Sequence, residues 1–136
     1  MLEFRRVLFR SVIISQVPDL PIGKFKAEAA IVNYYPMDST LSGHIDHSEP
    51  NKEAPLISIS LGQSAIFLLG GPSKCVEPLA LLVRHGDILI MSQEARQSYH
   101  AVPKILPDPT SHELDHPFVQ SYLSNHRINM NIRQVF

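Results

Sequence analysis

The chain has 136 residues, of which 44% are hydrophobic and 18% charged, and its formal net charge is −1. This length allows one domain with a sizeable core, and the near-neutral charge excludes a global basic field, so a contact with nucleic acid needs a local basic patch. The single cysteine, Cys75, excludes an intrachain disulfide and a cysteine zinc cluster, and it predicts a reducing, intracellular compartment. No apolar run is long enough to span a membrane.

The first eleven residues differ from the rest of the chain. Residues 3–11 carry three arginines among apolar side chains and resemble a translated sequencing-adapter remnant. A transit peptide is the alternative for an arginine-rich start. We expect residues 1–11 to be a non-native leader and residues 12–136 to form a single, N-terminally truncated domain. The choice between nucleus, cytoplasm and mitochondrion therefore cannot be read from this end.

From Ala27 onward, short apolar runs alternate with turn residues, which is typical of an all-β sandwich or barrel. Gly62-Gln63 separates two apolar runs by two residues and predicts a hairpin. Gly70-Gly71-Pro72 ends a strand, and His85-Gly86-Asp87 predicts a tight reversal. A short helix is expected at 117–124. The expected strands span residues 27–35, 41–46, 55–61, 64–69, 78–83, 87–91, 98–102 and 127–135.

Residues 105–116 interrupt this rhythm. Two prolines, three acidic residues and two histidines in a polar setting predict a surface loop. Its His112-x-x-x-His116 pair has the helical spacing of metal ligands, but it lies beside Pro117, so we expect solvated side chains. Eight short strands with few or no helices predict an all-β core, built as a double-stranded β-helix or jelly roll.

Asn33-Tyr34-Tyr35 lies on the first expected strand. Residues two apart on a strand share a face, so Asn33 and Tyr35 offer an amide and a phenol on the same side. Taken alone, the pair is more typical of a turn residue and an aromatic core residue than of a binding site.

His44-Ile45-Asp46 follows on the next expected strand, where alternation makes His44 and Asp46 converge. With His100 downstream, the set contains two imidazoles and one carboxylate, which is the facial triad of non-haem Fe(II) oxygenases. The alternative is a turn-flanking polar pair with a separate surface histidine. His47 also competes, but it points to the opposite face of the strand.

The last expected strand is also amphipathic. Arg127, Asn129, Asn131 and Arg133 lie on one face, and the apolar residues between them lie on the other. A plain edge strand with its polar face in water is the alternative. Two arginines and two asparagines, without lysine or glutamate, also suit a pocket for a dicarboxylate, because guanidinium pairs bidentately with carboxylate.

The order of these patterns, Asn-x-Tyr, His-x-Asp, His-x-x-Pro and Arg-x-Asn-x-x-x-Arg, resembles the AlkB family of Fe(II)/2-oxoglutarate dioxygenases over about residues 27–136. Residues 61–71 and 85–87 also resemble the barrel core of that family, and its eukaryotic branch is the most similar. The resemblance implies that Fe(II) is held by His44, Asp46 and His100. It implies a 2-oxoglutarate site made of Asn33, Tyr35, Arg127, Asn129 and Arg133.

In that site, Arg127 would pair with the distal carboxylate of 2-oxoglutarate, and Arg133 would brace the end near the metal and Asp46. The implied reaction uses O₂ and removes methyl groups from N-methylated DNA or RNA, including 1-methyladenine in tRNA. It releases formaldehyde, succinate and CO₂. We expect a monomer that does not bind membranes.

Two residues are candidates for substrate contact. Bacterial relatives carry an acidic base-reading residue two positions after the metal aspartate, where this chain has Ser48 followed by Glu49. Glu49 is therefore the candidate for reading the base. Lys74 is the candidate for meeting a phosphate, with a solvated lysine as the alternative.

Two other functions remain open from the residues alone. A 2-oxoglutarate oxygenase that acts on protein or small molecules would have the same jelly roll and triad. A non-catalytic jelly-roll binding module would use its histidines structurally. A basic rim near Lys74 and Lys104 would favour a nucleic-acid substrate.

Overall fold

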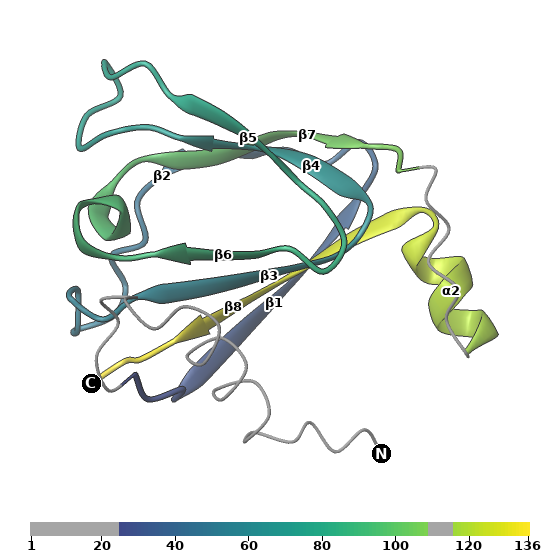
Figure 1. The fold of residues 1–136 in the computed structure, drawn as a ribbon, viewed down its shortest axis with the longest axis horizontal. Helices are drawn as coiled ribbons and strands as arrows, with labels where there is room; N and C mark the ends of the chain where they lie inside the picture. Colours follow the sequence, from purple (N-terminus) through teal and green to yellow (C-terminus); the bar gives the residue numbers. More distant parts are fainter. Residues whose placement is uncertain (1–24, 109–115) are drawn as a thin grey trace.

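Two four-stranded antiparallel sheets lie face to face in the computed structural model, which describes residues 25–108 and 116–136 (Figure 1). The first sheet has the order β1 (Ala29–Pro36), β8 (His126–Arg133), β3 (Leu56–Gly62), β6 (Ile88–Met91). The second has the order β2 (Leu41–His44), β7 (His100–Leu106), β4 (Ser64–Leu69), β5 (Leu79–Val83). The expected leader at residues 1–11 lies outside the described residues.

The chain changes sheet at almost every connection. Among the described strands, only β4 and β5 are consecutive in sequence and paired in one sheet. The predicted all-β jelly roll is therefore confirmed, and each expected strand corresponds to an observed one. This topology places the ends of distant segments side by side, which positions the candidate site.

The predicted hairpin at Gly62-Gln63 is wrong, because β3 and β4 lie in different sheets. These two residues form a corner instead. Gly62 has a φ of +77°, and a Cβ there would collide with the main-chain oxygen of His126. The Gln63 amide donates to that same oxygen at 3.1 Å, which ties the corner to the start of β8. A two-residue connection fits either geometry, so spacing alone does not distinguish them.

The predicted tight turn at residues 85–87 is confirmed. The Asp87 amide donates to the Arg84 carbonyl at 3.1 Å, and the Asp87 carboxylate accepts from the Arg84 amide at 2.7 Å. Gly86 has a φ of +86°, which favours glycine. This turn also carries the chain from one sheet to the other.

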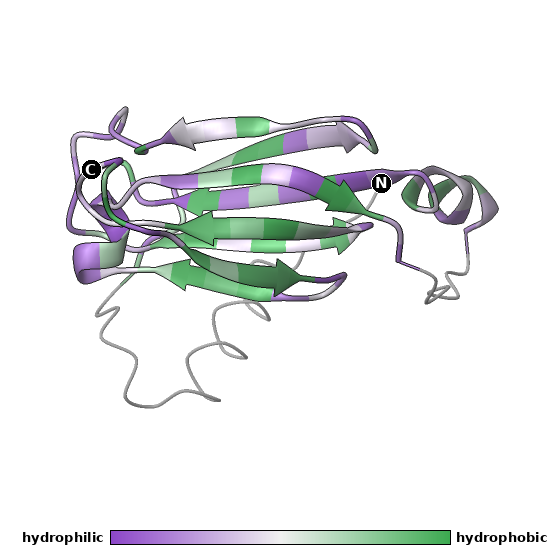
Figure 2. Cartoon of the chain, turned by 90° about the horizontal axis from the view of Figure 1, so that it is seen from above, coloured by the Kyte–Doolittle hydropathy of each residue, from purple (hydrophilic) through white to green (hydrophobic). Residues whose placement is uncertain are grey.

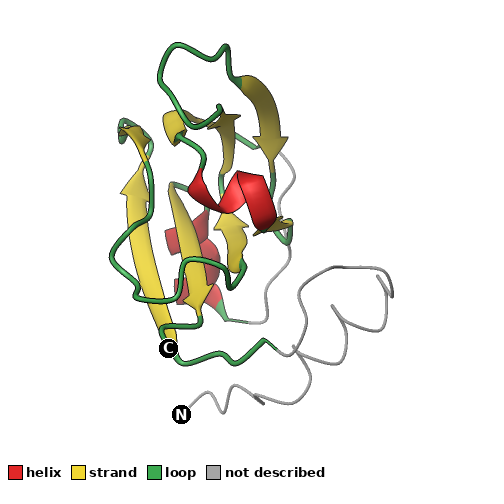
Figure 3. Cartoon of the chain, turned by 90° about the vertical axis from the view of Figure 1, so that its left-hand side faces the viewer, coloured by secondary structure: helices red, strands yellow, loops and turns green. Residues whose placement is uncertain are grey.

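Helical structure is limited to two short segments in the described part of the chain. The predicted helix is confirmed as α2 (Pro117–Leu123), which begins with a proline at its first turn. The 3₁₀ helix η1 (Gln93–Gln97) was not expected; it lies in front of the strands at one end of the molecule (Figure 3). Neither segment is long and apolar enough to cross a membrane.

Two strand ends differ from expectation. β7 continues to Leu106, so the expected loop at residues 105–116 begins after that residue, and residues 109–115 of it lie outside the described part. β2 ends at His44, which leaves Asp46 beyond the strand. Asp46 is therefore placed by the segment that follows β2 rather than by strand alternation.

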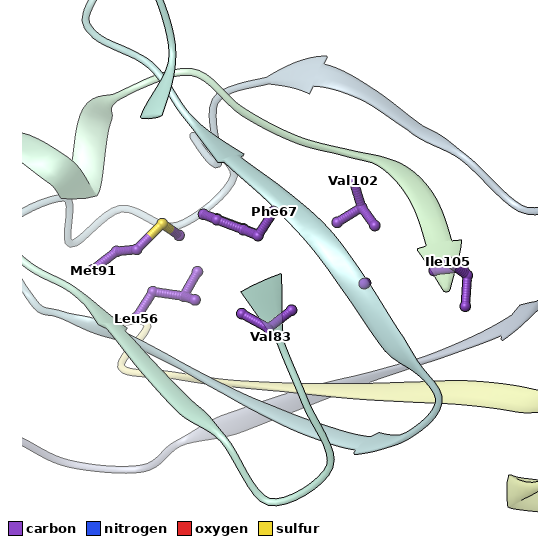
Figure 4. Close-up of a cluster of buried hydrophobic side chains, with 7 residues drawn as sticks. Leu56, Phe67, Val83, Met91, Val102 and Ile105 are labelled. Carbon is purple, nitrogen blue, oxygen red and sulfur yellow. The ribbon is translucent and has the colours of Figure 1, made fainter. Parts of the chain in front are cut away.

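Apolar side chains from both sheets meet between the layers. Hydrophobic residues concentrate along the strands (Figure 2). The buried cluster, drawn in Figure 4, contains Ala65 and the labelled residues Leu56, Phe67, Val83, Met91, Val102 and Ile105. A second cluster, Phe25, Ile57 and Ile59, lies on the opposite face of β3. Burial of each such large side chain stabilises the fold by roughly 1.5–3 kcal/mol.

Candidate functional site

A cavity of about 240 Å³ opens between the two sheets. Strands β1 and β8 supply its polar wall, and β2, β4 and β7 supply the opposite wall. The cavity is lined by every residue expected to bind iron or 2-oxoglutarate: Asn33, Tyr35, His44, Asp46, His100, Arg127, Asn129 and Arg133. The two sets predicted from separate parts of the sequence therefore share one space.

His44, Asp46 and His100 converge at one end of this cavity. His44 and His100 are cross-strand partners at the ends of β2 and β7, and their ring centroids lie 4.4 Å apart. The Asp46 carboxylate lies 3.6 Å from Nε2 of His44 and 3.7 Å from Nε2 of His100. One ligand atom from each residue lies within 4.8 Å of the others. Two imidazoles and one carboxylate at this spacing suit a divalent metal ion.

The second ring nitrogen of each histidine is oriented by a main-chain carbonyl. Nδ1 lies 2.9 Å from the Ser42 oxygen in His44 and 3.2 Å from the Ser98 oxygen in His100. Donation from Nδ1 leaves Nε2 with its lone pair toward Asp46, as a metal ligand requires. Burial lowers the pKa of His100, which favours the neutral form that binds metal.

Two of the competing histidines, His47 and His116, lie away from the cavity. His47 is exposed, and its Nδ1 lies 2.8 Å from the Ile45 carbonyl. His116 is exposed at the start of α2, and His112 lies outside the described residues. Neither His47 nor His116 lines the cavity.

Arg127 is a buried cation with unused donors. Its side chain is 2% exposed, and Nη2 donates to the Ser60 hydroxyl at 2.9 Å. Nε and Nη1 have no hydrogen-bond partner. Burial lowers the pKa of Arg127 and raises the pKa of Tyr35, its cross-strand neighbour. A desolvated guanidinium with two free donors is costly alone and suits an acidic ligand.

Asn129 lies between the two arginines on β8. Its amide nitrogen donates to the Ser58 hydroxyl at 2.7 Å and to the Ile59 carbonyl at 3.2 Å. Asn33 is its cross-strand partner on β1. These contacts fix the Asn129 amide group in the cavity, between Arg127 and Arg133 on β8.

Arg133 joins the metal ligands to Glu49. Its Nη2 lies 3.1 Å from the Asp46 carboxylate, and its Nη1 donates to the Glu49 carboxylate. Its Nε is buried without a partner. One guanidinium therefore bridges two carboxylates at the triad end of the cavity.

The position of Glu49 differs from the expected contact with a base. Glu49 is 6% exposed and does not line the cavity. One carboxylate oxygen accepts from Ser48 at 2.8 Å and from Arg133, and the other pairs with Arg96 at 3.0 Å. Burial acts to raise the pKa of Glu49, but the hydrogen bonds from Ser48 and Arg133 and the charge of Arg133 lower it to about 2. Both oxygens of this carboxylate are thus engaged inside the protein, and base reading by Glu49 stays a prediction.

Lys74 is exposed, and its ammonium lies 5.4 Å from the centroid of the Tyr99 ring. It does not line the cavity. Its contact with a phosphate stays a prediction.

Arg96 was missed by the sequence reasoning. It lies in η1, is 2% exposed, and donates to the Asp46 carbonyl at 2.8 Å and the Ala54 carbonyl at 3.2 Å. A lone arginine in a segment without periodicity carries no signal of burial, because arginine is mostly exposed.

The donor set fits a divalent cation next to a dicarboxylate. The triad offers three ligand atoms, and Arg127 offers two buried, unpartnered N–H groups in the same cavity. The unpartnered donors of Arg127 remain costly until an anion satisfies them.

Comparisons with known proteins agree with this chemistry. The model of the family described as the 2OG-Fe(II) oxygenase superfamily matches residues 6–133. The DNA N(6)-methyladenine demethylase ALKBH1A of Arabidopsis thaliana is 44% identical over 86% of this chain and 37% of its own length. The tRNA demethylase abh1 of Schizosaccharomyces pombe is 45% identical over 82% of this chain and 37% of its own length. The chain thus spans just over a third of these relatives.

A solved structure, that of OsALKBH1, superposes with a TM-score of 0.66 at 26% identity. The match covers 81% of this chain and 51% of that structure.

Proposed function

The chain belongs to the 2OG-Fe(II) oxygenase superfamily, its relatives are AlkB homologues, and we propose that it oxidatively demethylates N-methylated bases in nucleic acid. One observation carries the proposal most directly. The triad and the unpartnered Arg127 guanidinium line the same cavity, so a cation site and an anion site lie within reach of one small ligand.

His44, Asp46 and His100 would hold Fe(II), which leaves coordination positions open toward the cavity. With 2-oxoglutarate and O₂, the bound iron supplies oxidation of an N-methyl group, and the products are succinate, CO₂ and formaldehyde. The chain's part is to fix the ligands, and the Ser42 and Ser98 carbonyls orient the two imidazoles through their Nδ1 atoms.

Arg127 would bind the distal carboxylate of 2-oxoglutarate through its free Nε and Nη1 groups. Tyr35 and Asn129 line the same end and offer a hydroxyl and an amide. Arg133, at the other end, would neutralise the carboxylate nearest the metal while it holds Asp46. With one arginine of β8 at each of its two carboxylates, 2-oxoglutarate would be held in one orientation.

Apolar side chains close the rest of the cavity. Leu56, Phe67 and Met91 line it and are buried. Their presence excludes water and strengthens the pairing of each arginine with its carboxylate. A reactive centre of this kind is reached by a base that has left its stack.

The nucleic-acid substrate is supported by the relatives, whose names give DNA in one case and tRNA in another. Exposed Lys74, in the connection between β4 and β5, and exposed Lys104, on β7, add the local positive charge that a near-neutral chain needs for a nucleic-acid contact. We propose N-methylated DNA or RNA, including tRNA, as the substrate class.

The test is turnover of 2-oxoglutarate by the full-length protein, with 1-methyladenine oligonucleotides and with unmethylated oligonucleotides of the same sequence. The proposal requires release of succinate and formaldehyde that rises with the methylated strand only. Succinate release that no nucleic acid stimulates would indicate an oxygenase for protein or small molecules. Absence of both turnover and metal binding would indicate a non-catalytic binding module.

We also propose a monomer in a reducing, intracellular compartment. The single cysteine, Cys75, is a free and exposed thiol, which fits such a compartment. Light scattering should give the mass of one chain, and a fluorescent fusion of the full-length protein should remain inside the cell. A dimer mass or secretion of the fusion would refute the respective statement.

A further inference from the structure

Four charged side chains form a cluster at the triad: the half-buried Asp46 and the buried Glu49, Arg96 and Arg133. Each carboxylate pairs with Arg133, and Glu49 also pairs with Arg96 at 3.0 Å. Two negative and two positive charges balance, which a buried cluster requires. Only Asp46 and Arg133 of this set face the cavity.

Arg96 holds the segment between β2 and β3 at two points. Its Nη1 donates to the Asp46 carbonyl and its Nε to the Ala54 carbonyl. This segment contains no strand, so the position of Asp46 depends on such ties. The η1 helix, which contains Arg96, lies at the same end of the molecule as the segment between β2 and β3 (Figure 1).

Because Glu49 also pairs with Arg133, the Arg133 guanidinium interacts with two carboxylates instead of with Asp46 alone. Arg133 uses Nη2 for Asp46 and Nη1 for Glu49. Without the charge on Glu49, Asp46 would be the remaining carboxylate of the cluster. A guanidinium paired with Asp46 alone competes more strongly with a metal ion for the same carboxylate oxygen.

We propose that Glu49 and Arg96 are positioning residues, which set the Asp46 carboxylate for the metal ion and the Arg133 guanidinium for the near end of the cosubstrate. The inference rests on the proposed function. It assigns Glu49 a role different from reading the substrate base, because both of its oxygens are already engaged inside the protein.

The proposal predicts a specific loss in Glu49→Gln. The amide cannot balance the two guanidiniums, so the affinity for a divalent ion should fall roughly 10–100-fold, as for other residues that orient metal ligands. Arg96→Lys should act in the same direction, because one ammonium does not reproduce the guanidinium fork that meets Asp46, Ala54 and Glu49. Glu53→Gln is the matched control, since Glu53 is exposed in the same segment.

The experiment titrates the metal-free full chain with Co²⁺, followed by its visible absorption and by calorimetry, with folding checked by near-ultraviolet circular dichroism. The expected result is weaker binding and an altered Co²⁺ spectrum in Glu49→Gln and Arg96→Lys, with Glu53→Gln unchanged. Folded variants that bind Co²⁺ with the wild-type affinity and spectrum would overturn the proposal. If Glu49→Gln does not fold, Arg96→Lys decides by the same criterion.

Failure of the proposed function gives a different result. The proposed function would fail in the turnover assay, through succinate release that no methylated oligonucleotide stimulates, while Co²⁺ binding by the unsubstituted chain persists. Absence of Co²⁺ binding by the unsubstituted chain would refute the proposed function and the positioning role together. A second readout separates positioning from base recognition: the proposal predicts the same loss of metal affinity with no oligonucleotide present. A variant that loses only oligonucleotide binding would instead return Glu49 to base reading and would refute the positioning role.

Discussion

Arg127→Met should change stability and cosubstrate binding in opposite directions. The side chain is 2% exposed, and two of its donors, Nε and Nη1, have no partner. Each unsatisfied buried donor costs about 1–3 kcal/mol, and the lost bond to Ser60 offsets part of the gain. We therefore expect the free energy of unfolding of the ligand-free chain to rise by about 1–3 kcal/mol.

The same substitution should remove most of the affinity for 2-oxoglutarate. Two charge-assisted hydrogen bonds, at about 1.5–3 kcal/mol each, correspond to a loss of at least a hundredfold. Urea denaturation gives the stability, and calorimetry with Mn²⁺ present gives the affinity. Arg84→Met is the control: Arg84 is exposed, so both quantities should stay close to those of the unsubstituted chain. A destabilised Arg127→Met that still binds 2-oxoglutarate would refute the reasoning.

Two further predictions concern Glu49 and the sheet corner. The pKa of Glu49 is lowered from 4.5 to about 2 in the folded chain. Between those pH values the unfolded chain therefore binds more protons than the folded chain. The stabilisation from Glu49 is present above pH 4.5 and is lost as the pH falls toward 2. In urea denaturation, the stability difference between the unsubstituted chain and Glu49→Gln should narrow across that window by about 3 kcal/mol; an unchanged difference would contradict the assignment. Gly62→Ala should destabilise the chain by at least about 1 kcal/mol more than Gly86→Ala, because both glycines have positive φ but only at Gly62 does a Cβ collide with the His126 oxygen. Equal losses in the same denaturation assay would argue against the corner.

Strand alternation predicted the β8 face of the site well. Arg127, Asn129 and Arg133 are spaced by even numbers within one regular strand, so a period of two residues is sufficient to place them on the same face. The same reasoning placed Asn33 and Tyr35 on β1, and the antiparallel register sets them opposite Asn129 and Arg127.

Long-range contacts, rather than the alternation of side chains along a strand, bring the three triad residues together. β2 ends at His44, so Asp46 is held by Arg96 and Arg133 from distant parts of the chain. His100 arrives through the pairing of β2 with β7. Such long-range contacts leave no local pattern in the sequence.

The errors have the same origin. The connection at Gly62-Gln63 has the length of a hairpin, but sheet membership depends on partners far away in the chain. The burial of Glu49 was not expected either, because it depends on pairing with Arg96, whose η1 segment has no periodic signal. Local pattern specified the strands, whereas the buried charges required the tertiary structure.

The central claim is that His44, Asp46 and His100 hold iron beside a bound 2-oxo acid. Anaerobic addition of Fe(II) and 2-oxoglutarate to the full-length protein tests it most directly, since chelation of a 2-oxo acid by Fe(II) gives a weak visible charge-transfer band. We expect this band in the unsubstituted protein and its loss in folded His44→Ala and His100→Ala. Absence of the band in the unsubstituted protein, or an undiminished band in both variants, would contradict the account.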